Sequence, residues 1–435
     1  MDKKAIIDIL NDWNFWQKDL NTGIRRGFYL DKLNKFLASN QVVVITGPRR
    51  SGKSFLMKQM ARGLIEKRVE KENILMINFE DPRWEKLNAA LLEKIFETYL
   101  ELVGGTKRPY VFLDEIQEVE GWEKWVRMAQ ELGKAKITVS GSNAKLLSRE
   151  LATLLTGRHL SQTILPLSFK EFLIFNGVKI DSPLSLIENK IRIKKLLNEA
   201  LEFGLFPETV FTETKKELLL NYFGDIINKD IAERYRIRKK ESLKSLVKFY
   251  LSNTSALATF SSAGKASGVS TDTAQKFSSY IEASYLIFFL KRFSWKVKEQ
   301  EKSPRKIYAV DPGLANAIGF RFNRNLGSLM ENFVFLELFR KKTVNPNREI
   351  FFWKDHRHRE VDFVVKEGLK VNQLIQVCWN LDDIKTKKRE IGSLLKAMNE
   401  FNLKSGLIIT DDEEGEEIIK NKKIKYTPLW KWLLE

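Results

Sequence analysis

Residues 41–54 read QVVVITGPRRSGKS, a short apolar stretch rich in β-branched residues that runs into a loop with two glycines. The following residues 55–67, FLMKQMARGLIEK, repeat apolar side chains at helical spacing. The stretch therefore predicts a strand, a tight loop and a helix, in that order. Residues 47–54 also fit the pattern GxxxxGK[ST], within the strand and helix that this pattern requires.

This loop has the chemistry of a phosphate-binding site. Glycines let successive backbone N–H groups face a phosphate, and the start of a helix adds favourable partial charge. Lys53 is expected to neutralise the β and γ phosphates, and the Ser54 hydroxyl to ligate Mg²⁺. A chance glycine loop is the weaker alternative. The sequence thus predicts ATP and Mg²⁺ as cofactors, with these nucleotide-binding residues: Gly47, Pro48, Arg49, Arg50, Ser51, Gly52, Lys53, Ser54 and Phe55.

A second motif supplies two acids. In YVFLDE, residues 110–115, four apolar or aromatic strand residues deliver Asp114 to the end of a strand, where we expect it to bind Mg²⁺. The next residue, Glu115, is predicted to orient and deprotonate the attacking water. An exposed acidic turn is the alternative. An acid pair after a buried strand favours hydrolysis over nucleotide binding alone.

Further strands are expected at residues 73–79, NILMINF, and 137–142, ITVSGS, with helical stretches between them. Strands that alternate with helices predict a parallel sheet, so the fold class is α/β. At this point the sequence resembles the AAA+ and related additional-strand P-loop ATPases. The resemblance places Ser142 and Asn143 against the γ-phosphate, although Gly141, Ser142 and Asn143 also suit a simple turn.

The resemblance also suggests a role for Arg158, which stands just before the strand-like run SQTILPL. Its position is similar to that of the arginine with which these families sense or stabilise the γ-phosphate, in some cases on a neighbouring subunit. A cation at a helix end is the alternative. The resemblance further implies a homo-oligomer, with a ring as one form.

The length, the net charge and the composition of the chain indicate its number of domains, its class of partner and its location in the cell. A chain of 435 residues predicts about three domains. The formal net charge of +18 favours a polyanionic partner such as DNA over a merely solvated surface. The single cysteine excludes an internal disulfide or a cysteine-based zinc cluster. No apolar run is long enough for a membrane span and no signal peptide is evident, so we expect a cytoplasmic protein without a membrane partner.

We expect four domains: a P-loop core at 1–165, a helical lid at 166–235, a winged helix-turn-helix at 236–318 and a separate α/β domain at 319–435. Residues 270–287 suit a recognition helix, with small polar residues near its start. The expected wing has a basic tip that is predicted to contact phosphates. A winged helix is also a common protein-binding module. The basic residues of that tip are Lys296, Lys298, Lys302, Arg305 and Lys306.

The whole chain resembles a widespread archaeal and bacterial ATPase family with a winged helix and a C-terminal domain of the PD-(D/E)XK, restriction-endonuclease-like type. The matching phrases include INFEDPR (77–83), YAVDPGL (308–314), LMENFVF (329–335) and REVDFVV (359–365). The resemblance implies a metal site built on Glu331 and Asp362, with Glu360 close in sequence.

The third place of the nuclease motif departs from the family pattern. It calls for an acid and a lysine, but this chain has Gln376 and Cys378. An amide is a poorer metal ligand than a carboxylate, and a thiol does not replace an ammonium group. We therefore expect a nuclease-inactive domain that binds DNA or serves assembly.

Together these features predict a Mg²⁺-dependent ATPase that binds DNA and couples hydrolysis to DNA remodelling, translocation or loading, with fork or junction DNA as a plausible substrate. One alternative is a nucleotide-dependent switch that binds a protein partner. Another is an ATP-gated nuclease with a non-standard site.

Overall fold

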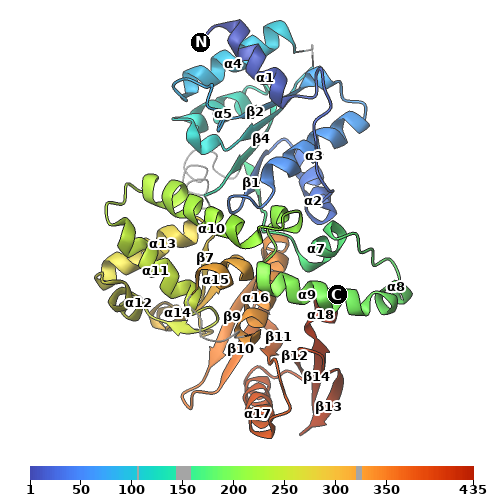
Figure 1. Ribbon diagram of the computed structural model, residues 1–435, viewed down its shortest axis with the longest axis vertical. Coiled ribbons are helices and arrows are strands. Elements are labelled where there is room, and N and C mark those ends of the chain that lie inside the picture. The colour runs from blue at the N-terminus through green and yellow to red at the C-terminus, as the bar shows by residue number, and fades with distance from the viewer. Residues whose placement is uncertain (105–106, 144–157, 320–325) are drawn as a thin grey trace. The chain divides into compact units, whose positions relative to one another are not determined.

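The computed structural model describes residues 1–104, 107–143, 158–319 and 326–435. The chain divides into two compact units, Met1–Ile164 and Leu165–Glu435 (Figure 1). Within the described residues, no helix is both long and apolar enough to span a bilayer. The first unit holds the phosphate-loop motif and the acid pair.

The first unit is built on a five-stranded parallel sheet in the order β2-β3-β4-β1-β5. The strands expected from the sequence are confirmed, and β4 lies between β1 and β3. The carboxyl ends of β1 and β3, which precede the two motifs, therefore lie at one edge with the end of β4 between them. The strands are β1 (Val42–Thr46), β2 (Ile74–Asn78), β3 (Tyr110–Asp114), β4 (Lys136–Gly141) and β5 (His159–Thr163).

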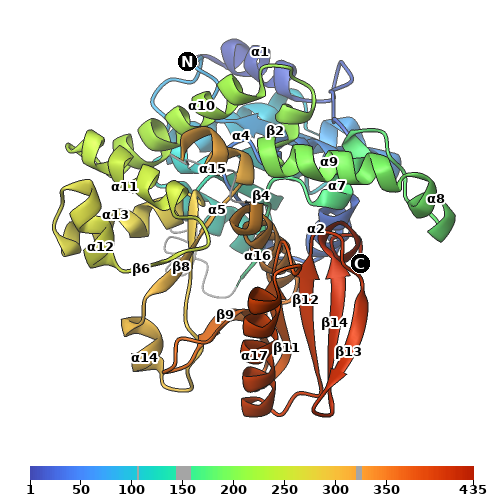
Figure 2. The ribbon, with the colours of Figure 1, turned by 60° about the horizontal axis from the view of Figure 1, so that its bottom comes forward.

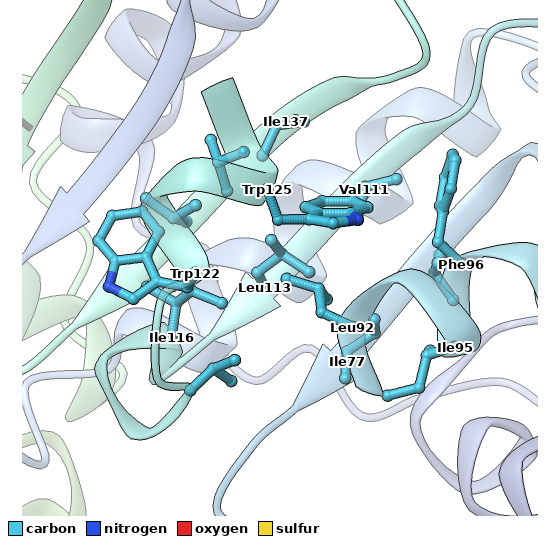
Figure 3. Close-up of a cluster of buried hydrophobic side chains, with 14 of the residues drawn as sticks. Ile77, Leu92, Ile95, Phe96, Val111, Leu113, Ile116, Trp122, Trp125 and Ile137 are labelled. Carbon is cyan, nitrogen blue, oxygen red and sulfur yellow. The ribbon is translucent and has the colours of Figure 1, made fainter. Parts of the chain in front are cut away.

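Helices cover both faces of this sheet because strand side chains alternate between the faces. Val42 and Val44 belong to one hydrophobic cluster, while Val43 and Ile45 belong to another. The first cluster is formed with α1 (Lys3–Trp13), α4 (Ala89–Leu102) and α5 (Trp122–Glu131), and Figure 3 shows part of it. The second cluster is formed with α2 (Gly27–Ala38) and α3 (Lys53–Glu66). The result is a three-layer sandwich that holds the sheet edge rigidly. Short 3-10 turns are η1 (Lys71–Asn73) and η2 (Ile116–Glu118).

The second unit begins with helices where the sequence predicts a lid. Asp311 Oδ2 accepts a hydrogen bond from Leu205 N at 2.6 Å, and the Asn316 amide donates to Leu201 O and Glu202 O. These bonds tie the helical stretch to residues 311–316 of the same unit, and its role as a lid stays a prediction. The elements are α7 (Phe169–Phe175), α8 (Pro183–Glu188), α9 (Lys190–Phe203), η3 (Pro207–Val210), α10 (Lys215–Asp225) and the π-helix η4 (Ile226–Glu233).

Residue 204 has to be glycine for this junction to form. Its φ is +80°, and a Cβ there would lie 1.9 Å from Asp311 Oδ1. The phrases GLFP and YAVDPGL therefore meet in space, because the glycine of the first makes room for the aspartate of the second.

Next come further helices and a small antiparallel sheet in the order β6-β8-β7. Two strands, residues 287–290 and 305–309, flank the basic tip expected from the sequence, and residues 297–302 of this tip form a short helix. The elements are α11 (Lys240–Ser252), β6 (Leu257–Ala258), α12 (Phe260–Ser267), α13 (Thr271–Ala283), β7 (Ile287–Leu290), α14 (Val297–Lys302), β8 (Arg305–Ala309) and α15 (Pro312–Ile318).

The C-terminal part holds a mixed six-stranded sheet in the order β13-β14-β12-β11-β10-β9 (Figure 2). Val364 packs on the side of α17, whereas its neighbour Phe363 contacts Tyr308, which stacks on Phe335 of α16. The two long helices thus cover opposite faces. The elements are α16 (Leu326–Val344), β9 (Arg348–Lys354), β10 (Glu360–Glu367), β11 (Lys370–Val377), α17 (Ile384–Glu400), β12 (Ser405–Thr410), β13 (Gly415–Ile419), β14 (Lys422–Pro428) and α18 (Leu429–Trp432).

Candidate nucleotide-binding site

The phosphate loop joins β1 to α3, and two of its positions require glycine. Gly47 has φ +146°, and a Cβ there would lie 2.0 Å from Ile164 O. Gly52 has φ +93° directly before the helix begins. Both conformations are ones that side chains disfavour. The glycines of the motif are therefore explained by backbone geometry as well as by phosphate approach.

Lys53 lies in the first turn of α3 and is almost fully buried, with 4% of its surface exposed. Its Nζ donates to Pro48 O at 3.2 Å and lies 3.2 Å from Glu115 Oε1. The lysine of the first motif and the glutamate of the second thus form a buried ion pair. This pair places the ammonium group at the loop whose backbone would carry the phosphates.

The two predicted metal-binding residues also meet. The Ser54 hydroxyl is hydrogen-bonded to the Asp114 carboxylate, which also accepts from the Ser140 hydroxyl. Burial and the neighbouring Glu115 raise the pKa of Asp114, although the hydrogen bonds from these two hydroxyls lower it. A hydroxyl and a carboxylate at one point are oxygen ligands of the kind that Mg²⁺ takes. Ser54 and Asp114 therefore have oxygen atoms of the kind that would hold a magnesium ion.

Glu115 has a constrained backbone and a defined side-chain orientation. Its φ is +53°, and its N–H donates to Ser140 Oγ at 3.1 Å. The Gln117 amide donates to Glu115 Oε2 at 2.6 Å. Burial alone would raise the pKa of Glu115, but the charge of Lys53 lowers it to about 2. Glu115 is therefore an ionised carboxylate held by two partners.

Gln117 is a residue that sequence reasoning missed. Asn78 ends the neighbouring strand β2, and its side-chain oxygen accepts a hydrogen bond from Glu80 N at 3.0 Å. The position of Gln117 two residues after the glutamate was the available signal, but a short-range side-chain bond of this kind depends on the local turn η2.

Two further residues missed by sequence reasoning hold the loop from outside. Arg26 is buried, and its Nη1 donates to Ser51 O at 2.6 Å. The Gln59 side chain accepts from Arg26 N and donates to the backbone oxygens of Thr22 and Ile24. The segment before α2 is thereby fixed to both the phosphate loop and α3.

Ser142 and Asn143 directly follow β4 and are both buried. Gly141 pairs with Thr46, the residue before the phosphate loop. The structure thus brings both residues to the sheet edge that carries Lys53 and Glu115. Their contact with a γ-phosphate stays a prediction.

The structure places Arg158 away from this edge. It precedes β5, whose first residue pairs with Val42 at the start of β1. A five-residue strand is about 16 Å long, so Arg158 lies roughly that far from the phosphate loop of its own chain. Its Nη1 donates to Glu131 at 3.0 Å. A γ-phosphate contact within the same chain is therefore wrong, and action on a neighbouring subunit stays a prediction.

The remaining loop residues have different environments. Arg49 forms an ion pair with Glu80, and Arg50 takes a left-handed conformation with φ +66°. Phe55 is 43% exposed and lies against Gly23. The Ser51 hydroxyl is buried without a hydrogen-bond partner among the described residues.

The acidic residues of the C-terminal part lie together around a lysine that we had assigned to the wing. Lys306 is 2% exposed, and its Nζ lies within 3.0 Å of carboxylate oxygens of Glu331, Glu360 and Asp362. The prediction that Lys306 contacts phosphates at the wing tip is therefore wrong, because its side chain is buried. Gln376 and Cys378 are on or directly after β11, and the Gln376 amide donates to Glu390.

Family models match three consecutive parts of the chain. Residues 39–173 match a model described as an AAA domain. Residues 194–325 and 326–432 match two domains of unknown function, DUF8612 and DUF4143.

Two relatives match much of the chain. "Uncharacterized protein MJ1544" of Methanocaldococcus jannaschii is 36% identical over 412 residues, which covers 92% of this chain and 89% of the relative. An "Uncharacterized protein" of Haemophilus influenzae is 34% identical over 328 residues, covering 73% of this chain and 79% of the relative.

Among solved structures, the Walker-type ATPase PABY2304 of Pyrococcus abyssi is similar with a TM-score of 0.45 and 16% identity, covering 69% of this chain and 99% of the other. The chain belongs to the protein family of these two relatives, and its residues 39–173 match an AAA domain.

Proposed function

We propose that the protein is a Mg²⁺-dependent ATPase. One observation carries the proposal: Lys53, Ser54, Asp114 and Glu115 meet at the end of β1 and β3, in two contacting pairs. The AAA domain supports it. Phosphoryl transfer to water requires a phosphate-binding loop with its lysine, a hydroxyl group and two acids. This chain has each of these groups.

In this reaction the phosphates of ATP take Glu115's place beside Lys53. Ser54 and Asp114 would hold Mg²⁺, and the bound ion would supply positive charge to neutralise the phosphates. Once released from Lys53, the Glu115 carboxylate accepts the proton of the attacking water, and Gln117 keeps the carboxylate oriented. Ser142 and Asn143 are suited to position the γ-phosphate from the end of β4.

The proposed partner is DNA, with hydrolysis driving remodelling, translocation or loading. The net charge of +18 supports a polyanionic partner. The chain order of helices α11, α12 and α13 followed by strands β7 and β8 supports the proposal of a winged helix in this part. Lys298 and Lys302 in the ribbon tip are exposed and have no ion pair within the described part of the chain. A homo-oligomer is part of this proposal.

A nucleotide-controlled switch with a protein partner is the second candidate. The buried Lys53–Glu115 pair favours it, because this pair has to break before the water is activated. Such a barrier suits slow turnover.

Steady-state ATP hydrolysis tests both candidates. We would measure it at fixed salt with no DNA and with duplex, forked, four-way and single-stranded DNA, beside Lys53→Ala and Glu115→Gln. Stimulation by one DNA structure supports the DNA-dependent ATPase. Hydrolysis that no DNA alters, together with no DNA binding at moderate salt, favours the switch. Equal phosphate release by wild type and both variants contradicts the ATPase proposal itself.

A further inference from the structure

A buried lysine is enclosed by three acids in the second unit. Lys306 Nζ lies 3.0 Å from Glu331 Oε1, 2.8 Å from Glu360 Oε1 and 2.7 Å from Asp362 Oδ1. The lysine comes from β8, whereas the acids come from α16 and β10. Residues far apart in sequence therefore contribute to one charged cluster.

The acids have further partners that fix their positions. Tyr308 donates its hydroxyl to Glu331 at 2.6 Å, and Val377 N donates to Asp362 Oδ2 at 2.8 Å. Lys354 forms a second ion pair with Glu360 at 3.0 Å. The carboxylate oxygens around Lys306 are thus held by the fold and do not depend on the lysine alone.

The lysine is charged in spite of its burial. Burial by itself lowers the pKa of Lys306, but Asp362 and Glu331 raise it well above its usual value. Removing an ammonium group from such a cluster would leave buried carboxylates without their main counter-charge. The cluster therefore requires a cation at this point.

We propose that Lys306 is the resident cation of this acidic site, in the place that a divalent metal ion would otherwise occupy. A divalent ion would need the same three oxygens at about 2.0–2.6 Å, which is at most about 1 Å closer than they lie to Nζ. An ammonium group and a dication cannot share this space, because their charges repel. Among the described residues, no group of three or more His, Cys, Asp or Glu side chains is placed to hold a metal ion.

The assignment has two consequences. The site binds no divalent ion while Lys306 is present, so it supports no metal-dependent cleavage of a phosphodiester. The ion pairs of this lysine also connect β8 with α16 and β10. They therefore link the small sheet β6-β8-β7 to the C-terminal sheet. The charged cluster thus stabilises the packing of two parts of the second unit against each other.

The proposal is tested by asking whether a divalent metal ion restores the thermal stability that is lost when Lys306 is replaced. Thermal unfolding of the full chain without nucleotide would be followed with EDTA and with millimolar Mn²⁺. Lys306→Ala is expected to lower Tm, and Mn²⁺ to restore about 3 °C or more of the loss. Lys306→Met is the matched control, since its side chain fills the space without charge and should not be rescued.

The double variant Lys306→Ala, Asp362→Asn should lose the rescue, which separates this cluster from any metal binding elsewhere. Equal effects of Mn²⁺ on Lys306→Ala and on the double variant overturn the proposal.

A second measurement leaves Lys306 in place. Mn²⁺ binding to the wild-type protein and to Asp362→Asn is compared by titration calorimetry, and the two should agree. A wild-type Mn²⁺ site that disappears in Asp362→Asn overturns the assignment of Lys306 as the resident cation.

Discussion

Lys53 Nζ and Glu115 Oε1 lie 3.2 Å apart, and both side chains are buried. The pair joins the two motifs that nucleotide hydrolysis needs, and it holds each partner away from its proposed task. The lysine is not free for phosphates, and the glutamate is not free for water. Nucleotide binding thus has to replace one strong interaction by another.

Replacing Glu115 should separate binding from hydrolysis. Glu115→Gln is expected to lower kcat by about 10²–10⁴, the usual contribution of a general base. ATP affinity should be kept or increased, because Lys53 no longer loses a charged partner on binding. Phosphate release and nucleotide titration measure the two quantities. Glu120→Gln, an exposed acid on the same loop, is the control, and a similar loss of kcat there would contradict the assignment.

Gln117 is expected to position Glu115 without taking part in binding. Gln117→Ala removes the 2.6 Å hydrogen bond to Glu115 Oε2 and should lower kcat about tenfold with little change in KM. Gln117→Asn, which keeps an amide one methylene shorter, should recover part of the rate in the kinetic assay. A change in KM alone would show that Gln117 acts on nucleotide binding.

Arg26 should stabilise the phosphate loop. Arg26→Met leaves the buried Ser51 carbonyl without this donor, so the free energy of unfolding of the first unit should fall by about 1–3 kcal/mol. KM for ATP should rise, because the loop is less well ordered. Denaturant unfolding and steady-state kinetics check these outcomes. Arg25→Met alters an exposed neighbour and should change neither; equal effects of the two substitutions would argue against the Arg26 contact.

Asp311 should make the stability of the second unit depend on pH. Burial raises the pKa of its carboxyl to about 7 from the ordinary 3.8. The folded state therefore keeps a proton that the unfolded chain releases. This contribution to stability is complete below about pH 4, falls as pH rises toward 7 and is absent above it. The expected loss is on the order of a few kcal/mol.

The comparison uses denaturant unfolding at pH 5 and pH 8. Asp311→Asn should be less stable than wild type at both values, since the amide cannot accept the hydrogen bonds of both Leu205 N and Leu314 N. Its stability should nevertheless change less between the two pH values. Asp272→Asn, at an exposed acid, should keep the wild-type pH dependence. The same pH dependence in wild type and Asp311→Asn would rule out this origin.

The nucleotide-binding edge could be predicted from the sequence because its information is local. A strand, a glycine loop and a helix follow one another within residues 42–66, and the sheet order brings Asp114 to the same edge. Arg26 and Gln59 could not be found in this way, since their partners are backbone atoms and any residue supplies those. Arg158 precedes β5, and in a parallel sheet the start of a strand lies at the edge opposite the phosphate loop, so only its action on a neighbouring subunit stays a prediction.

In the C-terminal part, the sequence predicted the acidic residues of a site but not the cation that they contact. Glu331, Glu360 and Asp362 were singled out by their similarity to a known pattern, and the third position of that pattern lacked its lysine. The cation that these acids contact comes from β8, outside the matching segment. Its burial was not readable from residues 296–306, where five basic residues favour a solvated tip.

The hydrogen bond between Leu205 N and Asp311 spans 106 positions of the chain, and the Lys306 cluster spans further ones. Together these contacts restrict which segments of the chain recombination can exchange. A recombination event that exchanged residues 166–235, 236–318 or 319–435 with those of a distant relative would leave buried donors and carboxylates without partners. We therefore expect the segments after Ile164 to have evolved as one block.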